Sequence, residues 1–329
     1  QQLQKSLQYY YFENRWPCHL KTSSKLQART EKQGSLFELI TFLITFQFYK
    51  MKLLDGKKIA SEICEEIKKE IEEKNITPGL GVILIGNKSD SVKYVNMKRK
   101  KCEKLGIFQK LIHLEECITD QEVIQELEKL NKDEKIHGIL VQLPLPENLN
   151  TDIILSKIDP KKDVDGLHHR TMGRVTLNRN LTFYPCTPRG CIDLLRRYNL
   201  EIESKNIVIV GKSNIVGLPL SIMLMNLDAT VSVCHHKTNN IKFYTQNADI
   251  LIVACGVPNL VDDTWIKKGV TILDVGITVT EKGVVGDVNF EKVKDKVNYI
   301  TPVPGGIGPM TIAILMKQVF ESYCSINNI

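Results

Sequence analysis

The stretch NIVIVGKSNIVGLPLSIML, residues 206–224, decides the fold of this chain. After Asn206 it has four branched apolar residues, turns between Gly211 and Gly217, and ends in an apolar helical stretch. A strand, a glycine turn and a helix in this order present backbone N–H groups and a helix N-terminus to a diphosphate. The turn lacks the usual G-x-G-x-x-G spacing, so on its own it also fits a tight turn without a ligand.

Strands and helices alternate on both sides of this stretch. Ile59, Ile63, Ile67 and Ile71 recur every four residues, which indicates an amphipathic helix over 57–74. Thr119 and Glu122 form a capping box for a helix that continues through Leu130. The other predicted elements are strands at 79–86, 110–114, 137–146, 206–211, 229–234, 249–254 and 270–276, and helices at 91–106, from 188 to about 199, after 217, and from 310 to about 323.

This alternation predicts an α/β fold with doubly wound, mostly parallel sheets. A chain of 329 residues with 43% hydrophobic residues suits two domains with a cleft between them. We expect an N-terminal α/β catalytic domain over 51–187 plus 309–329. A Rossmann-like dinucleotide-binding domain is expected over 188–308.

Residues 1–50 differ from the rest of the chain. They are rich in Gln and Tyr, carry seven Lys/Arg against three Asp/Glu, and precede the first methionine, Met51. The apolar run 36–49 is too short for a spanning helix. We expect a leader without a fixed fold, either translated upstream sequence or an organelle-targeting segment.

Charge and cysteine usage exclude several classes of protein. Much of the net charge of +6 belongs to residues 1–50, so the remainder offers no basic face large enough for nucleic acid. The nine cysteines form no C-x-x-C pair, which argues against zinc and disulfide frameworks and fits a reducing compartment. We expect no metal site.

Polar residues stand at several places typical of a ligand site. Tyr94 and Lys98 share one helix face, and a shielded Lys can exchange a proton near neutral pH. Gln142 ends an apolar strand, and Asp165 precedes a glycine in KDVDG. Each also has a structural interpretation: a surface Lys beside a core Tyr, a backbone-bonded Gln, and a turn-stabilising Asp.

Two further segments suggest how ligands are held. PVPGGIGPMT, residues 302–311, contains too many Pro and Gly for an ordinary connection and provides a rigid backbone that a flat ligand can approach. No acidic residue ends the strand 229–234; His235, His236 and Lys237 follow it instead. The missing carboxylate, with Lys212 nearby, favours NADP over NAD. Either histidine alone also fits a solvated loop residue.

The order of these motifs is more specific than any one of them. YVNMK, VQLPLP, KDVDG, PCTPRG, GKSNIVGLP and PVPGGIGPMT resemble, in sequence and order, the methylenetetrahydrofolate dehydrogenase/cyclohydrolase family, over Met51 to about Phe320. The resemblance implies oxidation of 5,10-methylenetetrahydrofolate by NADP⁺ and hydrolysis of the methenyl product to 10-formyltetrahydrofolate. These reactions belong to one-carbon metabolism and supply purine biosynthesis.

The resemblance also implies roles for individual residues. Lys98 is the central catalytic residue, Gln142 tunes it, and Tyr94 orients the folate. Asp165 holds the pterin, and Pro304, Gly305, Gly306 and Pro309 line the folate cleft. The implied cofactor-binding residues are Gly211, Lys212, Ser213, Ile215, His235, His236, Gly276 and Ile277. Many relatives have Arg at position 212, Ser at 236 and Asn at 171, where this chain has Lys, His and Thr.

Other interpretations of the sequence remain open. A short-chain dehydrogenase also carries Tyr-x-x-x-Lys, but there the glycine turn precedes the Tyr, whereas Gly211 follows Tyr94. A relative with only one of the two activities and a folate binder without turnover are the remaining alternatives. The expected partners are tetrahydrofolate derivatives and a second copy of the chain in a homodimer, with no nucleic acid and no membrane. We expect a cytoplasmic location, or a mitochondrial one if residues 1–50 act as a targeting segment.

Overall fold

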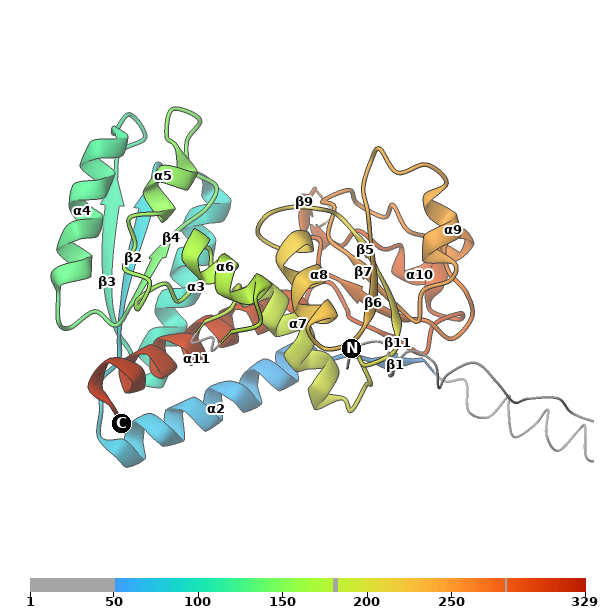
Figure 1. Ribbon diagram of the computed structural model, residues 1–329, viewed down its shortest axis with the longest axis horizontal. Helices are drawn as coiled ribbons and strands as arrows, with labels where there is room; N and C mark the ends of the chain where they lie inside the picture. Colours follow the sequence, from blue (N-terminus) through green and yellow to red (C-terminus); the bar gives the residue numbers. More distant parts are fainter. Residues whose placement is uncertain (1–50, 180–182, 282) are drawn as a thin grey trace, which may run out of the picture. The chain divides into compact units, whose positions relative to one another are not determined.

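A computed structural model describes residues 51–179, 183–281 and 283–329. The leader predicted for residues 1–50 therefore lies outside the described residues. Met51–Ile329 form one compact unit with two parallel sheets (Figure 1). The doubly wound α/β fold predicted from the sequence is confirmed.

The smaller sheet contains three parallel strands in the order β3-β2-β4. β2 is Gly79–Ile85, β3 is Phe108–Leu114 and β4 is Gly138–Val141. Helices α2 (Gly56–Lys74), α3 (Ser89–Leu105) and α4 (Asp120–Lys132) connect or flank these strands. We call this part the three-stranded lobe.

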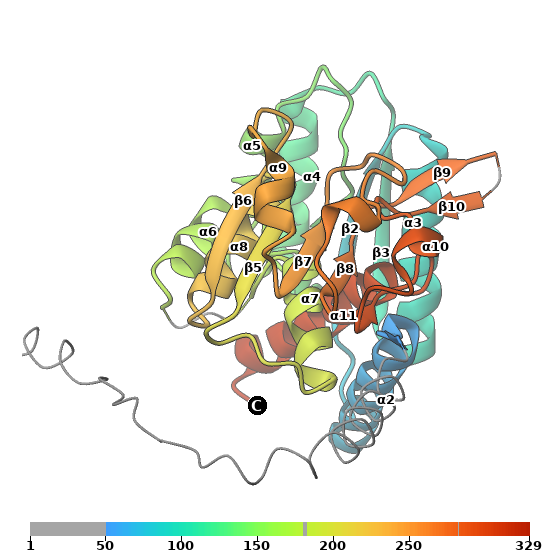
Figure 2. The same cartoon turned by 90° about the vertical axis from the view of Figure 1, so that its right-hand side faces the viewer.

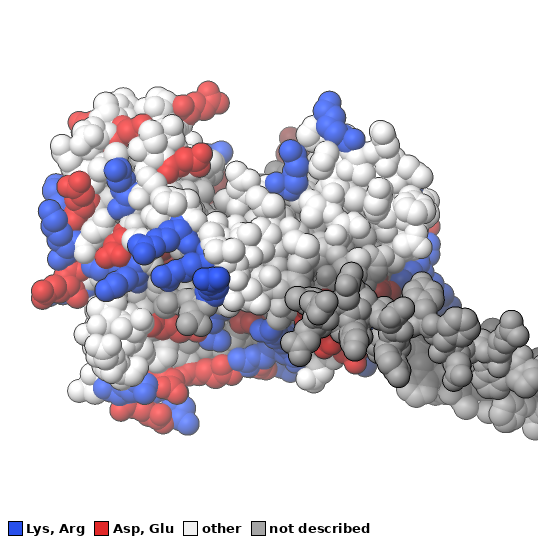
Figure 3. Space-filling view, viewed as in Figure 1, with Lys and Arg blue, Asp and Glu red and all other residues white. Residues whose placement is uncertain are grey.

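The strands β2 and β4 are buried on both faces, as near-continuous apolar strands predict, whereas the edge strand β3 is partly exposed. Ile83, Ile139 and Val141 pack with Val123 and Leu127 of α4. Successive side chains point to opposite faces, so the alternate residues of β2 face α2 and α3 instead. Charges of both signs are interspersed along the exposed face of α2 (Figure 3), where Lys and Glu pair at i, i+4 spacing.

The larger sheet contains six parallel strands in the order β1-β11-β8-β7-β5-β6. Their bounds are β1 Lys52–Leu53, β5 Asn206–Val210, β6 Thr230–Cys234, β7 Ile250–Val253, β8 Thr271–Asp274 and β11 Tyr299–Ile300. Figure 2 shows β6, β5, β7 and β8 side by side. The chain moves outward from β5 to β6 and returns to β7 on the other side. The strand order therefore reverses at β5, the usual ligand position in open α/β sheets.

Helices cover both faces of this six-stranded lobe. α7 (Cys186–Arg197) and α8 (Gly217–Met225) pack on one face, and α9 (Ile241–Thr245) and α10 (Phe290–Val293) lie against the other. α11 (Ile307–Asn327) runs beside α2 and α7 (Figure 1) and joins the two lobes. The remaining elements are α5 (Thr151–Leu155), α6 (His169–Thr176), a 3₁₀ turn (Asp263–Trp265) and an antiparallel hairpin of β9 (Thr278–Thr280) and β10 (Gly283–Val285).

Most predicted elements appear within a few residues of their expected bounds. The last helix is longer than predicted, because it starts at Ile307 within the proline- and glycine-rich segment. The strand predicted over 137–146 is shorter, since Pro144 and Pro146 have no N–H to donate to a neighbouring strand. β1 is an addition: it pairs with β11, so the chain passes through the six-stranded sheet before it builds the other lobe.

Candidate active site

Lys98 is the buried centre of the candidate site. Its side chain is 9% exposed, one turn of α3 after the half-buried Tyr94. Its Nζ donates a hydrogen bond to Oε1 of Gln142 at 2.9 Å, just after β4 ends. The amide of Gln142 is itself held, because Nε2 donates to the carbonyl of Leu143 at 2.7 Å. Gln142, at the end of β4, therefore has a side-chain partner on another element and is more than a backbone-bonded residue.

Asp165 lies next to this lysine and is half-buried. Burial lowers the pKa of Lys98, and the Asp165 charge opposes that shift. Burial likewise raises the pKa of Asp165, and Lys98 opposes it. Each group thus supports the charged form of the other in a shielded site. A lysine with a lowered pKa can act as a base nearer neutral pH than a free lysine.

Asp163, two residues earlier, is the residue that stabilises the KDVDG turn. Its carboxylate accepts from the N–H groups of Leu167 (3.2 Å) and His168 (3.1 Å) and from Oγ1 of Thr171 (2.6 Å). The turn-stabilising role that the sequence allowed for Asp165 therefore belongs to Asp163. Thr171 makes the shortest of these bonds.

Two neighbouring pockets open beside Lys98. The first, of about 320 Å³, is lined by residues of both lobes, including Tyr94, Lys98, Gln142, Asp165, Ile215 and Ile277. The second, of about 390 Å³, is lined by Tyr94, Ile277, Pro304, Gly305, Gly306 and Pro309 among others. Tyr94, Val275, Ile277, Ile307 and Gly308 line both. We call the first the lysine pocket and the second the outer pocket.

The turn after β5 has the geometry of a diphosphate cradle. Gly211 has φ +127°, and a Cβ there would lie 2.1 Å from the carbonyl oxygen of Ala254. A Cβ on Gly217 would lie 2.0 Å from the carbonyl oxygen of Gly211. Only glycine fits at either position. No described side chain caps the first turn of α8, but the N–H of Leu218 donates to the carbonyl of Ser213 at 3.0 Å and Pro219 has no N–H, so the N–H that this turn can offer to a ligand is that of Gly217.

The side chains on and beside this turn suit a phosphorylated dinucleotide. Lys212, Ser213 and Ile215 are exposed, as is His236 after β6. Nδ1 of His235 is already used, since it accepts from the N–H of Lys237 at 3.2 Å. His236 is thus freer than His235 to meet a ligand. The residues present fit a dinucleotide with a charged phosphate at this edge.

The predicted site residues fall into two groups. Tyr94, Lys98, Gln142, Asp165, Ile215 and Ile277 come together around the lysine pocket, with the proline–glycine segment on its outer side. Gly211, Lys212, Ser213, His235, His236 and Gly276 line neither pocket; they lie on or next to the loops that follow β5, β6 and β8. Sequence reasoning missed Thr187, Thr311 and Cys186 as lining residues. The motifs PCTPRG and PVPGGIGPMT contained the signal for all three.

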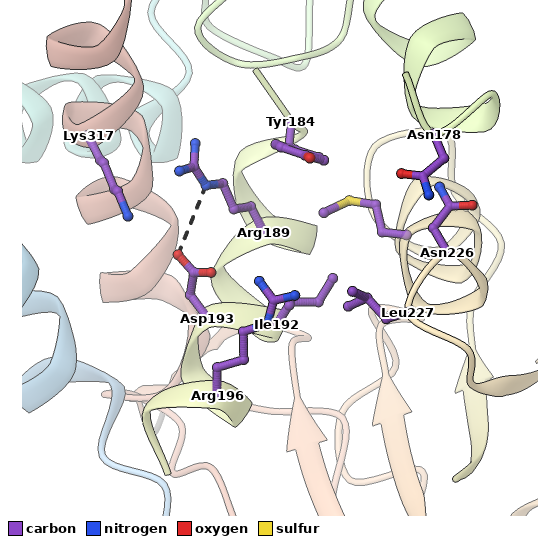
Figure 4. Close-up of a pocket in the computed structure, with 10 residues that line it drawn as sticks. Asn178, Tyr184, Arg189, Ile192, Asp193, Arg196, Asn226, Leu227 and Lys317 are labelled. Atoms are coloured by element: carbon purple, nitrogen blue, oxygen red, sulfur yellow. Dashed lines mark ion pairs between the residues drawn. The ribbon is translucent and has the colours of Figure 1, made fainter. Parts of the chain in front are cut away.

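A further pocket of about 260 Å³ lies between α7, α8 and α11 and contains no predicted site residue (Figure 4). Its most deeply set cation, Arg189, is neutralised by Glu321 through two bonds of 2.7 Å. That bidentate pair joins α7 to α11. We therefore assign this pocket a structural role.

The described residues contain neither a membrane-spanning helix nor a cluster of metal ligands. No helix in residues 51–179, 183–281 and 283–329 combines the length and apolarity that crossing a bilayer requires. Over the same residues, no three His, Cys, Asp or Glu side chains gather as metal ligands would. The eight cysteines of this part are free thiols.

A glycine cradle at the reversal point of a parallel sheet, beside a pocket with a buried lysine, defines a dinucleotide-dependent enzyme of the two-lobed α/β class. Comparison with known protein families identifies the family of this enzyme. The catalytic-domain profile of tetrahydrofolate dehydrogenase/cyclohydrolase matches residues 54–165, and the NAD(P)-binding-domain profile matches residues 185–327. The chain belongs to the tetrahydrofolate dehydrogenase/cyclohydrolase family.

Known relatives match nearly their whole length. The Bifunctional protein FolD of Campylobacter jejuni serotype O:2 is 48% identical over 276 residues, 83% of this chain and 98% of that protein. The protein of the same name from Nautilia profundicola is 46% identical, over 83% and 97%.

Two solved structures are similar as well. A Campylobacter jejuni FolD crystal structure has a TM-score of 0.82 at 47% identity and covers 85% of this chain and all of the other. A Trypanosoma brucei FolD structure, complexed with NADP cofactor and inhibitor, has a TM-score of 0.81 at 36% identity, over 85% and 99%.

Proposed function

We propose that this chain is a bifunctional enzyme with two consecutive reactions in one site. It oxidises 5,10-methylenetetrahydrofolate to the 5,10-methenyl form with NADP⁺ and hydrolyses that product to 10-formyltetrahydrofolate. The observation that carries the proposal is Lys98, bonded to Gln142 and facing Asp165, in a pocket that both lobes line. Membership of the family, with matches to both of its domains, supports both activities.

The residues around the lysine pocket receive specific roles in this proposal. Asp165 accepts hydrogen bonds from the pterin ring, since a carboxylate can pair with adjacent N–H groups. Tyr94 packs against the folate at the boundary of the two pockets. Pro304, Gly305, Gly306 and Pro309 form the wall along which the rest of the folate extends. Their positions as lining residues support these roles.

Lys98 assists the hydrolytic step. The methenyl carbon is cationic, so water addition requires little more than a positioned base. Water forms a bond to that carbon, one of the two C–N bonds of the bridge breaks, and one proton is released. The Lys98 amine takes the proton from the water, and Gln142 keeps Nζ pointed at the pocket.

Hydride transfer needs the same carbon brought close to the dinucleotide. NADP⁺, when bound, accepts the hydride. Gly211, Ser213, Ile215 and the N–H of Gly217 at the start of α8 would hold its diphosphate, and Lys212 and His236 its additional phosphate. Gly276 and Ile277 adjoin the lysine pocket, where the hydride acceptor must lie. The protein's contribution is positioning across the cleft.

The proposal extends to organisation. Residues 51–187 with 309–329 form the folate-binding domain, and residues 188–308 bind the dinucleotide. The chain assembles as a homodimer, which light scattering would reveal as twice the chain mass of 37.4 kDa. A cytoplasmic location, with a mitochondrial one as the alternative, stays a prediction that cell fractionation tests.

One experiment separates the alternatives. The purified protein is mixed with 5,10-methylenetetrahydrofolate and NADP⁺ or NAD⁺, while reduced cofactor and formyl product are followed together. We expect reduction with NADP⁺ and formation of 10-formyltetrahydrofolate. Reduction without formyl product would leave a dehydrogenase alone. Folate binding with neither product would leave a binder and refute the proposal.

A further inference from the structure

Two buried carboxylates stand behind the edge where the dinucleotide is proposed to bind. Asp274 ends β8 and is 4% exposed; Asp287 follows the β9–β10 hairpin and is fully buried. Neither has a role in the reactions described above. Burying carboxylates is costly unless they are paired and hydrogen-bonded, so their contacts need an explanation.

Asp287 connects two loops at the carboxyl ends of neighbouring strands. Its Oδ2 accepts from the N–H of Cys255 (2.7 Å), the N–H of Gly256 (2.9 Å) and the Sγ of Cys255 (3.3 Å), all just after β7. The same carboxyl packs on Gly276 after β8, where an added Cβ would lie 2.1 Å from its Cγ. One side chain therefore sets the positions of both loops.

Asp274 holds Asp287 in return. Its Oδ1 accepts from the N–H of Asp287 at 2.9 Å, and its Oδ2 accepts from the N–H of Val288 at 3.0 Å. It also packs against Gly286, where a Cβ would lie 1.9 Å from its Oδ2. The two carboxylates thus fix each other's backbone segments reciprocally.

The arrangement leaves one atom unsatisfied. Oδ1 of Asp287 is buried and has no hydrogen-bond partner among the described residues. For stability alone a neutral side chain would be preferable here, because it would leave no oxygen of a buried carboxylate without a partner. What the second carboxylate oxygen, Oδ2, provides is a strong acceptor for two consecutive N–H groups.

The loops that Asp287 fixes border the proposed dinucleotide site. The carbonyl oxygen of Ala254 lies against Gly211, so the loop after β7 supports the glycine cradle. Val275 and Ile277, on either side of Gly276, line both the lysine pocket and the outer pocket. A shift of the loop after β7 would move the support of the glycine cradle, and a shift of 275–277 would move a wall of the lysine pocket next to that cradle, while Lys98, Gln142 and Asp165 keep their positions on other elements.

We propose that Asp287, held by Asp274, is a positioning residue for NADP⁺: it fixes the loops 254–256 and 275–277 that shape the dinucleotide site. It acts through these loops and touches neither substrate nor cofactor. This inference rests on the proposed function, since it concerns the dehydrogenase half of the reaction.

The test uses the full chain with Asp287→Asn. We expect the KM for NADP⁺ and its calorimetric Kd to rise about tenfold, the size expected when a charged acceptor is replaced by the weaker, neutral amide oxygen and the loops shift. Hydrolysis of methenyltetrahydrofolate needs no dinucleotide and depends on Lys98 and Gln142 on other elements, so its kcat/KM falls by a clearly smaller factor, about threefold or less, even though Val275 and Ile277 line the lysine pocket. The matched control is Asp249→Asn: Asp249 accepts the N–H of Asn206 at 2.9 Å, at the opposite end of the same sheet. Its KM for NADP⁺ stays at the wild-type value.

Asp274→Asn provides a second, milder variant with a smaller increase in the Kd for NADP⁺, should Asp287→Asn fail to fold. Unchanged NADP⁺ binding in the folded variants, or an equal loss of both activities, would overturn the inference. The calorimetric Kd requires no turnover. A wild-type protein that binds NADP⁺ without oxidising the folate would therefore count against the proposed function and leave this inference to be decided by the Kd.

Discussion

At the scale of single residues, the proposed chemistry depends on how the side chains of Tyr94, Lys98 and Gln142 are placed relative to one another. The i, i+4 spacing of Tyr94 and Lys98 predicts that they share one helix face, and they do. Spacing could not predict that Lys98 meets Gln142, because that contact joins residues 44 apart on different elements. Nor could it distinguish Asp163 from Asp165, since both lie in the same turn. Their roles follow from which carboxylate the local N–H groups occupy.

Replacement of Lys98 by Met tests the centre of the site. Met keeps an unbranched apolar side chain of similar length but cannot take a proton. We expect hydrolysis of methenyltetrahydrofolate to fall by about 10²- to 10⁴-fold, the usual contribution of general acid–base catalysis. Folate binding stays measurable by fluorescence titration. Lys100→Met, on the same helix but exposed, is the control and keeps full activity. Normal hydrolysis in Lys98→Met would remove Lys98 from the mechanism.

Gln142 is predicted to set the pH at which Lys98 works. Its Oε1 stabilises the ammonium form, so Gln142→Leu lowers the pKa of Lys98 further, and Gln142→Glu raises it. If the neutral amine is the active form, the rising limb of the pH–rate profile moves to lower pH in the Leu variant. The Glu variant moves it to higher pH. Shifts in the same direction in both variants would show that another group titrates.

At the scale of elements, long periodic segments were predictable and short ones were not. The capping box at Thr119 and Glu122 is present, and Gly106 ends α3 in the left-handed conformation at φ +73°. α5, α9 and α10 contain only four or five residues, too few for a helical period to appear. β1 and β11 have two residues each and exist only because tertiary pairing selects them.

The buried Lys162 holds the C-terminal end of α4, so its replacement should lower the stability of the protein. Lys162 is 8% exposed, and its Nζ donates to the carbonyls of Leu130, Asn131 and Asp133 at the end of α4. Carbonyls at a helix end have few intrahelical partners; here the N–H of Asp133 also donates to Leu130 at 3.3 Å and that of Ile136 to Asp133 at 3.1 Å. Lys162→Met should lower the free energy of unfolding by about 1–3 kcal/mol, measured by urea denaturation. Its exposed neighbour provides the control, and Lys161→Met should stay within about 0.5 kcal/mol of wild type. An unchanged urea midpoint in Lys162→Met would mean that the helix end is held by other contacts.

At the scale of the whole molecule, the strand and helix order predicted two sheets and the edge at which a dinucleotide would bind. The glycine turn after β5 indicated that edge, and in the structure the strand order reverses there. The sequence assigned residues 309–329 to the catalytic domain but did not predict which helices they contact. The apolar surface of α11 packs on α2 and α7 together, and such a pairing of distant segments depends on side-chain fit, which periodicity does not encode.

The buried acids give the whole molecule a predictable dependence on pH. Burial raises the pKa of Asp274 to about 7, and the neighbouring Asp287 carboxylate acts in the same direction. The folded state therefore holds a proton on Asp274 that the unfolded chain releases near its ordinary pKa of 3.8. Stability from this group is fully present below about pH 4 and is lost as the pH rises to about 7, with a slope of at most about 1.4 kcal/mol per pH unit.

Asp274→Asn isolates this contribution, because Asn cannot titrate. Urea denaturation of wild type and variant between pH 4 and 8 should give a difference that moves steadily in favour of the variant up to about pH 7 and is constant above it. Asp249→Asn is the opposite case. The bond from Lys267 lowers the pKa of Asp249, so its contribution is lost only as the pH falls below its ordinary value. The difference between wild type and Asp249→Asn should therefore stay flat from pH 5 to 8. A flat difference for Asp274→Asn as well would show that Asp274 is ionised throughout, and that its two N–H bonds stabilise the buried charge more than burial opposes it.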